Sequence, residues 1–149
     1  MNMKFMDIAY EEAMKAFEEG EIPVGCVIVY QDQVIARTHN QKEKLKSAVK
    51  HAEILAVDIA SGVLNNWRLE NCDVYITLEP CPMCASALKQ ARVRNIYCGL
   101  ANSDSNNFLL VNKILASDSV NPSVSIYNNL DVDRISKIMK SFFENRRNK

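Results

Sequence analysis

This 149-residue chain lacks the features that mark several classes of protein. No apolar run approaches the roughly 18 residues that a membrane-spanning helix needs, so we expect no membrane partner. Acidic and basic residues number 18 each, and this zero net charge gives no overall sign of a nucleic-acid partner. Any contact with RNA would have to come from local patches. Glycine and proline number only four each, and no internal repeat, low-complexity tract or linker is present.

What remains is the composition of a globular domain. Apolar residues make up 48% of the chain, and a chain of this length closes a core without disulfide staples. The five cysteines are an odd number, which does not suit a disulfide framework. We therefore predict a single domain over residues 1–149. We also expect a cytoplasmic location, where cysteines are free thiols or metal ligands.

Hydrophobic periodicity predicts helices and strands in alternation. The expected helices cover residues 5–19, 51–62, 82–91, 109–115 and 132–146. The expected strands cover residues 21–30, 34–37, 73–78, 93–98 and 123–127, and the first two form a hairpin. The polar residues 100–107 are expected to be irregular. Strands separated by helices indicate an α/β fold with a mixed sheet and helices on both faces.

Two short motifs carry the chemistry, His51-Ala52-Glu53 and Pro80-Cys81-Pro82-Met83-Cys84. A zinc ion used for hydrolysis takes three protein ligands and leaves a fourth position for water, and His51, Cys81 and Cys84 supply such a set. Glu53 would lie outside the metal shell and move protons. The spacing matches the H-x-E…P-C-x-x-C signature known for zinc nucleobase deaminases. The sequence therefore predicts a hydrolytic deaminase.

Each motif alone has a simpler explanation. An H-x-E triplet occurs often by chance, and a C-x-x-C pair is typical of redox sites or of half a structural zinc knuckle. A closed structural site would need a fourth ligand, for which Cys72, Cys98 and His39 are candidates. The two motifs in this order, about 30 residues apart, favour the catalytic site.

A lysine-rich connection precedes the first motif. Residues 41–50 are polar and contain Lys42, Lys44, Lys46 and Lys50. Most runs of this kind are solvated loops. Because this one leads directly into His51, the alternative hypothesis is that its lysines flank the pocket and contact RNA phosphates.

Further motifs along nearly the whole chain carry a resemblance to one family. They are Glu21-Ile22-Pro23-Val24-Gly25, Val34-Ile35-Ala36 with His39-Asn40, His51-Ala52-Glu53, Trp67-Arg68-Leu69-Glu70, Tyr75-Ile76-Thr77-Leu78-Glu79-Pro80-Cys81-Pro82-Met83-Cys84, and Ser141-Phe142-Phe143 with Arg146-Arg147. With these motifs the chain resembles the bacterial tRNA adenosine deaminases of the cytidine deaminase-like superfamily.

The resemblance implies a fold, a reaction and partners. The fold would be a three-layer α/β/α sandwich with a five-stranded mixed sheet. The reaction would be zinc-dependent deamination of adenosine to inosine at the wobble position of a tRNA anticodon arm, with one Zn²⁺ per chain in a homodimer. The resemblance also implies that Asn40 contacts the flipped nucleoside and that Val24 and Ala52 line its pocket.

One segment departs from the family. Where the family usually carries a loop with a glycine and a lysine, residues 100–107 contain neither. Two alternatives therefore stay open. One is a deaminase of a free nucleobase or nucleoside, of the guanine or cytosine type, and the other is a non-catalytic zinc subunit that helps a partner bind RNA. Glu53 argues against the second, because a structural zinc site has no use for that carboxylate.

Overall fold

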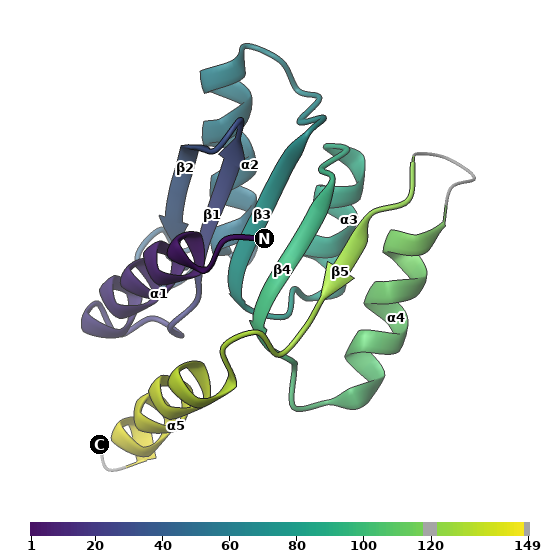
Figure 1. Ribbon diagram of the computed structural model, residues 1–149. Coiled ribbons are helices and arrows are strands. Elements are labelled where there is room, and N and C mark those ends of the chain that lie inside the picture. Colours follow the sequence, from purple (N-terminus) through teal and green to yellow (C-terminus); the bar gives the residue numbers. More distant parts are fainter. Residues whose placement is uncertain (118–121, 148–149) are drawn as a thin grey trace.

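A computed structural model describes residues 1–117 and 122–147 of the chain (Figure 1). Its centre is a five-stranded sheet in the order β2-β1-β3-β4-β5. The strands are β1 (Gly25–Tyr30), β2 (Gln33–His39), β3 (Cys72–Leu78), β4 (Asn95–Leu100) and β5 (Ser125–Tyr127). β1 is antiparallel to β2 and to β3, whereas β3, β4 and β5 are parallel. The predicted hairpin and mixed sheet are confirmed.

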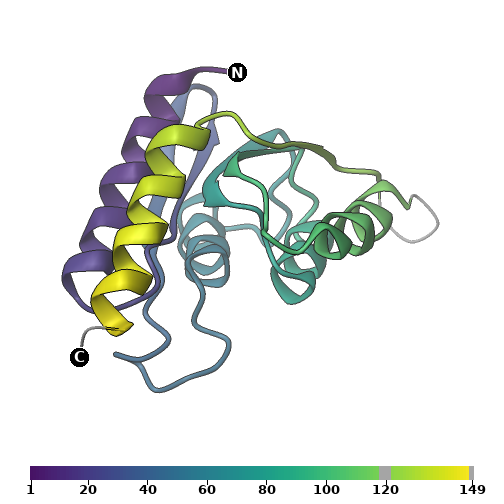
Figure 2. The same cartoon turned by 90° about the horizontal axis from the view of Figure 1, so that it is seen from below.

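Within the described residues, five helices cover the two faces of this sheet. They are α1 (Met3–Glu18), α2 (Ala52–Leu64), α3 (Pro82–Gln90), α4 (Ser105–Ala116) and α5 (Val132–Arg147). α2, α3 and α4 lie on one face, and α1 and α5 lie side by side on the other (Figures 1 and 2). This arrangement is the predicted three-layer sandwich. In the described part of the chain, no helix combines the length and apolar character needed to cross a bilayer.

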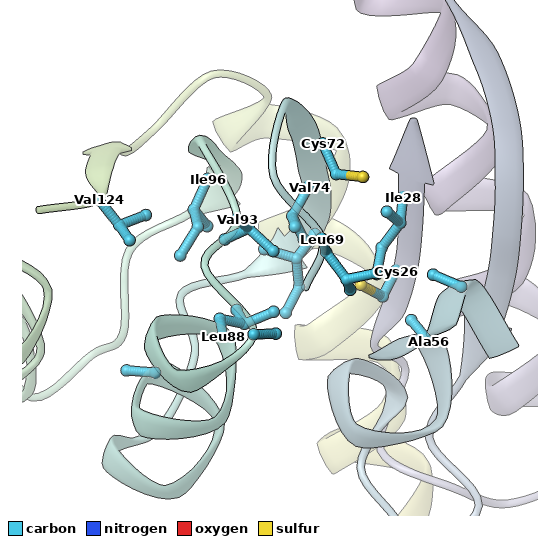
Figure 3. Packing of buried hydrophobic residues seen from close by; sticks show 14 of the residues in the cluster. Cys26, Ile28, Ala56, Leu69, Cys72, Val74, Leu88, Val93, Ile96 and Val124 are labelled. Atoms are coloured by element: carbon cyan, nitrogen blue, oxygen red, sulfur yellow. The ribbon is translucent and has the colours of Figure 1, made fainter. Parts of the chain in front are cut away.

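Side chains alternate across the strands and so fill a core on each side of the sheet. On β1, Val27 packs toward α1, while Cys26 and Ile28 face the larger core beneath α2, α3 and α4 (Figure 3). α1 approaches β1 so closely that a Cβ atom on Gly25 would lie 1.9 Å from the carbonyl oxygen of Ala9. The first residue of β1 must therefore be a glycine.

Two boundaries differ from the prediction by four residues, and the others differ by at most two. The strand expected over residues 21–30 begins only at Gly25, because Pro23 has no N–H group to donate to a sheet. The helix expected over residues 109–115 begins at Ser105 instead. Asp104 caps this helix by accepting a hydrogen bond from the backbone N–H of Asn106 at 3.0 Å. Half of the segment expected to be irregular is thus the first turn of α4 and its cap.

Glu12 on α1 holds the end of β2, directly before Asn40. Its carboxylate is only 3% exposed and accepts hydrogen bonds from Lys15, Arg37 and His39. Burial by itself raises the pKa of Glu12, but these hydrogen bonds outweigh burial and hold the pKa below its ordinary value of 4.5. A folded-state pKa below the unfolded one means that ionised Glu12 stabilises the fold above pH 4.5, and this contribution is lost as the pH falls through the folded-state pKa.

We expect Glu12→Gln to lower the free energy of unfolding at pH 7 by about 2 kcal/mol, because hydrogen bonds to a charged group are lost in a buried place. The difference from the wild type should shrink at a second, acidic pH below the folded-state pKa, where the wild-type carboxyl also takes up a proton. Chemical denaturation at the two pH values measures this, with Glu18→Gln on the exposed side of α1 as the control. An equal difference at both pH values would contradict the role of the ionised carboxylate.

Candidate metal centre and substrate pocket

The two sequence motifs meet where two helices begin. His51 is the residue before α2 and Cys81 is the residue before α3, and both have an extended backbone. Cys84 lies in the first turn of α3, after Pro82, whose ring suits the first helical position. Because α2 and α3 pack side by side on one face of the sheet, their N-terminal ends converge (Figure 1). Tertiary packing thus brings the three predicted ligands together across about 30 residues of chain.

The donor atoms have the spacing of a tetrahedral zinc site. His51 Nδ1 lies 3.8 Å from Cys81 Sγ and 3.5 Å from Cys84 Sγ, and all three donor atoms lie within 4.8 Å of one another. Bonds of about 2.3 Å to sulfur and 2.0 Å to nitrogen at tetrahedral angles require a separation of about 3.5 Å between nitrogen and sulfur. The type and spacing of these donors therefore fit zinc.

The fourth position of this site is open on the protein side. Among the described residues, no other histidine, cysteine, aspartate or glutamate joins the group. His39, a candidate fourth ligand, is instead bonded to Glu12 and Glu19 at 3.1 and 3.0 Å. Cys72 and Cys98 are free thiols buried in the sheet. The closed structural site considered as an alternative is therefore wrong for these residues.

The thiols of Cys81 and Cys84 differ in pKa, and metal binding requires both to be deprotonated. A hydrogen bond with Cys84 lowers the pKa of Cys81 to about 5, and the backbone N–H groups of Met83 and Cys84 at the start of α3 add to this effect. The same hydrogen bond, together with burial, raises the pKa of Cys84. Cys81 therefore ionises more readily than Cys84, and a cation that binds both sulfur atoms must displace the proton of Cys84.

Glu53 lies beside this group in the first turn of α2. Its side chain is 3% exposed, and burial raises the pKa of its carboxyl group to about 7. On an ideal helix, residues two positions apart point in opposite directions. This geometry does not apply to His51, because His51 precedes the helix and has an extended backbone with φ −72° and ψ 157°. Both side chains can therefore reach the same pocket, as the prediction required.

A pocket of about 170 Å³ opens at this point. The predicted residues that line it are Val24, Asn40, His51, Ala52, Glu53 and Cys81. Cys84 lies behind them, fully buried. The structure thus brings together all seven residues assigned from the sequence, and their individual roles stay predictions.

Asn40 presents its amide to this pocket in a fixed orientation. Its Nδ2 donates to the carbonyl oxygen of Ile22 at 3.3 Å, and its Oδ1 accepts from the backbone N–H of Lys42 at 3.2 Å. A side-chain amide has two N–H groups and two lone pairs on its oxygen. One of each therefore remains for a substrate.

Five further residues of the lining were not assigned as site residues from the sequence, although Lys42 belongs to the lysines that the hypothesis placed beside the pocket. The five are Ile22, Lys42, Leu78, Glu79 and Asn102. Lys42 had a signal, since it stands two residues after Asn40 in the lysine-rich connection. Asn102 belongs to the segment that departs from the family, and its side chain makes a turn by accepting from the N–H of Asp104 at 2.9 Å.

Glu79 is the most consequential of these missed residues. Its buried carboxylate accepts hydrogen bonds from Asn107 on α4 at 2.5 Å and from Asn128 after β5 at 2.6 Å. Asn107 also donates to the carbonyl oxygen of Pro80, next to the ligand Cys81. The hydrogen bonds of Asn107 thus connect residues 100–107, the segment that differs from the family, to the turn that precedes Cys81. No local pattern predicts the contacts of Glu79, because the partners are 28 and 49 positions apart.

Known proteins provide an independent comparison. Residues 1–100 match the family described as the cytidine and deoxycytidylate deaminase zinc-binding region. The tRNA-specific adenosine deaminase of Aquifex aeolicus (strain VF5) is 36% identical over 144 residues, which cover 97% of this chain and 95% of that protein. A solved structure from studies of A-to-I editing by tRNA:A34 deaminases at the wobble position of transfer RNA is 33% identical, with a TM-score of 0.84 over 92% of this chain and 99% of that chain.

A guanine deaminase supplies a more distant comparison. The enzyme from Nitrosomonas europaea matches 95% of this chain and 84% of its own with a TM-score of 0.76, at 18% identity. This likeness shows a common fold alone.

Proposed function

The chain belongs to the tRNA-specific adenosine deaminases, and we propose that it converts adenosine to inosine at the wobble position of a tRNA anticodon. The observation that carries this proposal is the set of three zinc-binding donors with Glu53 buried beside it at the end of a small pocket. A structural zinc site needs neither the open fourth position nor the carboxylate. The alternative of a non-catalytic zinc subunit is therefore not favoured.

The reaction replaces the amine of adenine with an oxygen atom from water. His51, Cys81 and Cys84 would hold a zinc ion, which would supply Lewis-acid activation of that water. Glu53 accepts the proton that water gives up and delivers protons to the ring nitrogen and to the leaving amine, so that ammonia departs. A pKa of about 7 suits a group that must both take up and release a proton near neutral pH.

The size of the pocket supports a base that projects from a larger molecule. Its volume of about 170 Å³ is smaller than the roughly 300 Å³ of sites that enclose a whole drug-sized ligand. A purine can enter while its ribose and phosphate groups stay outside. This is the arrangement expected when a nucleotide is flipped out of a stacked strand. A deaminase of a free nucleobase is the second candidate, because such a base would also fit.

Incubation with total tRNA distinguishes the two candidates. We expect inosine at the wobble position of a tRNA and little ammonia release from free adenosine, cytidine or guanine. Sequencing of the tRNA reports inosine, and a coupled assay reports ammonia. Rapid deamination of a free base without any inosine in tRNA would overturn the proposal.

We further propose that the protein works as a homodimer formed through the face of α2, α3 and α4. α2 is apolar on nearly all sides, a pattern typical of a helix that is buried all round. In the single chain, however, Ile59 and Val63 are 46% and 58% exposed, and Leu109 and Leu110 on α4 are exposed on the same layer. A second copy would remove these side chains from water.

The double substitution Ile59→Glu with Val63→Glu should convert the dimer to a monomer, because it places two carboxylates in the apolar contact. Sedimentation or light scattering measures the mass. Val132→Glu, at an exposed valine on α5 across the sheet, is the control and should leave the mass unchanged. A wild-type protein that is already monomeric at micromolar concentration would contradict the proposal.

We also propose that residues 1–149 form one domain in the cytoplasm. Both hydrophobic cores use the same sheet, which supports one folding unit. All five cysteines are free thiols, and a zinc site with two thiolates and a tRNA substrate both suit a reducing compartment.

A further inference from the structure

The lysine-rich connection between β2 and α2 is a folded loop. The backbone N–H of Gln41 donates to the carbonyl oxygen of Lys50 at 3.1 Å and closes the ends of the loop, while turns within it join Ser47 to Lys42 and Leu45 to Gln41. Figure 2 shows this segment extending beyond the sheet. The loop therefore has a defined position relative to the pocket.

Glu21 anchors the start of this loop. Its side chain is 1% exposed, and its two carboxylate oxygens accept hydrogen bonds from the backbone N–H groups of Glu43 at 2.9 Å and Lys44 at 2.8 Å. Hydrogen bonds to an ionised acceptor are stronger than neutral ones. With Asn40, which holds the N–H of Lys42, two buried side chains thus fix three consecutive backbone groups.

The lysines of this loop differ in burial and in their contacts. Lys42 is partly buried and lines the catalytic pocket beside Asn40. Lys44 is mostly exposed and faces Glu19 at 4.0 Å. Among the described residues, Lys42 makes no ion pair, and it is the one lysine of the pocket lining. Its ammonium group is thus not committed to a carboxylate of the described residues, although the side chain borders the pocket.

We propose that Lys42, held at the rim of the pocket by Asn40 and by the buried carboxylate of Glu21, binds a phosphate group that flanks the nucleotide whose base enters the pocket. The inference rests on the proposed function, since a base within RNA brings such a phosphate to the rim. It identifies the substrate as a phosphate-linked nucleotide. Lys42 is the contact, and Glu21 is a positioning residue.

The first test removes the charge of Lys42. Lys42→Met should raise KM for a tRNA anticodon hairpin about tenfold with little change in kcat, because a charge-assisted contact is lost outside the reacting atoms. The slope of log affinity against log salt should fall by about one, as expected for one phosphate contact. Lys42→Arg should keep the slope. Lys113→Met, on the exposed side of α4, is the matched control and should behave as the wild type.

The second test locates the phosphate. Two hairpins are used, with an uncharged methylphosphonate in place of the phosphate on the 5′ or the 3′ side of the edited adenosine. One of them should raise KM of the wild type by the same factor and should leave KM of Lys42→Met unchanged. If both hairpins raise KM of Lys42→Met further, the assignment is overturned.

The third test examines Glu21. Gln at this position can accept only one of the two N–H groups, so Glu21→Gln should reproduce the higher KM and the lower salt slope with zinc content and kcat unchanged. Combining it with Lys42→Met should add little, because both act on one contact. Additive effects, or a salt slope unchanged in Lys42→Met, would overturn the inference while leaving the proposed function standing. A wild-type protein that makes no inosine in tRNA would overturn both.

Discussion

Replacing Glu53 by glutamine should lower kcat for inosine formation by at least about a hundredfold, because proton transfer by a positioned side chain contributes on that order or more. Glutamine has the same shape but exchanges no proton at neutral pH. Because the carboxylate is a neighbour of the three donor atoms and not a member of the group, zinc content should stay at one per chain. Single-turnover kinetics and elemental analysis measure the two quantities.

The matched control is Glu70→Gln, which removes a carboxylate from an exposed position outside the pocket lining and should leave both quantities unchanged. Loss of zinc from Glu53→Gln would show that this residue is a ligand. Full activity with zinc bound would instead require another proton carrier. Either result would contradict the separation of roles between Glu53 and the donors His51, Cys81 and Cys84.

Cys84→Ser should abolish zinc binding and activity together and lower the melting temperature by about 10 °C. A ligand at a thousand times its Kd stabilises a fold by about 4 kcal/mol, and 1 kcal/mol shifts the melting temperature of a domain of this size by about 2–4 °C. Cys84 is fully buried, so serine also leaves a hydroxyl group shielded from water. Elemental analysis and thermal unfolding measure both effects.

A strong chelator separates the metal contribution from the packing contribution. It should lower the melting temperature of the wild type and leave that of Cys84→Ser unchanged. Cys98→Ser is the matched control, because Cys98 is another fully buried cysteine on the neighbouring β4 strand and lies outside the donor group. That variant should keep its zinc and its response to the chelator. A Cys84→Ser protein that still responds would contradict the assignment of this thiol as a ligand.

Local patterns in the sequence determined the identity of the metal centre. Pro82 and the three-residue spacing of Cys81 and Cys84 describe one turn of a helix, so both sulfur atoms had to lie at its start. The alternation of apolar residues likewise predicted a mixed sheet between helices, since periodicity records which side of an element faces a core. Periodicity does not locate a boundary that a single capping side chain decides, as Asp104 does for α4.

Tertiary structure alone decided what surrounds that centre. Hydrogen bonds between distant segments, such as those of Glu79 with Asn107 and Asn128, leave no period or spacing in the sequence. The same holds for Glu21, whose buried carboxylate accepts hydrogen bonds from the backbone N–H groups of Glu43 and Lys44, more than 20 positions away. The sequence by itself thus determined the reactive groups, because ligand spacing is local. The fold decided the pocket, its rim and its anchors, because these depend on which distant segments pack together.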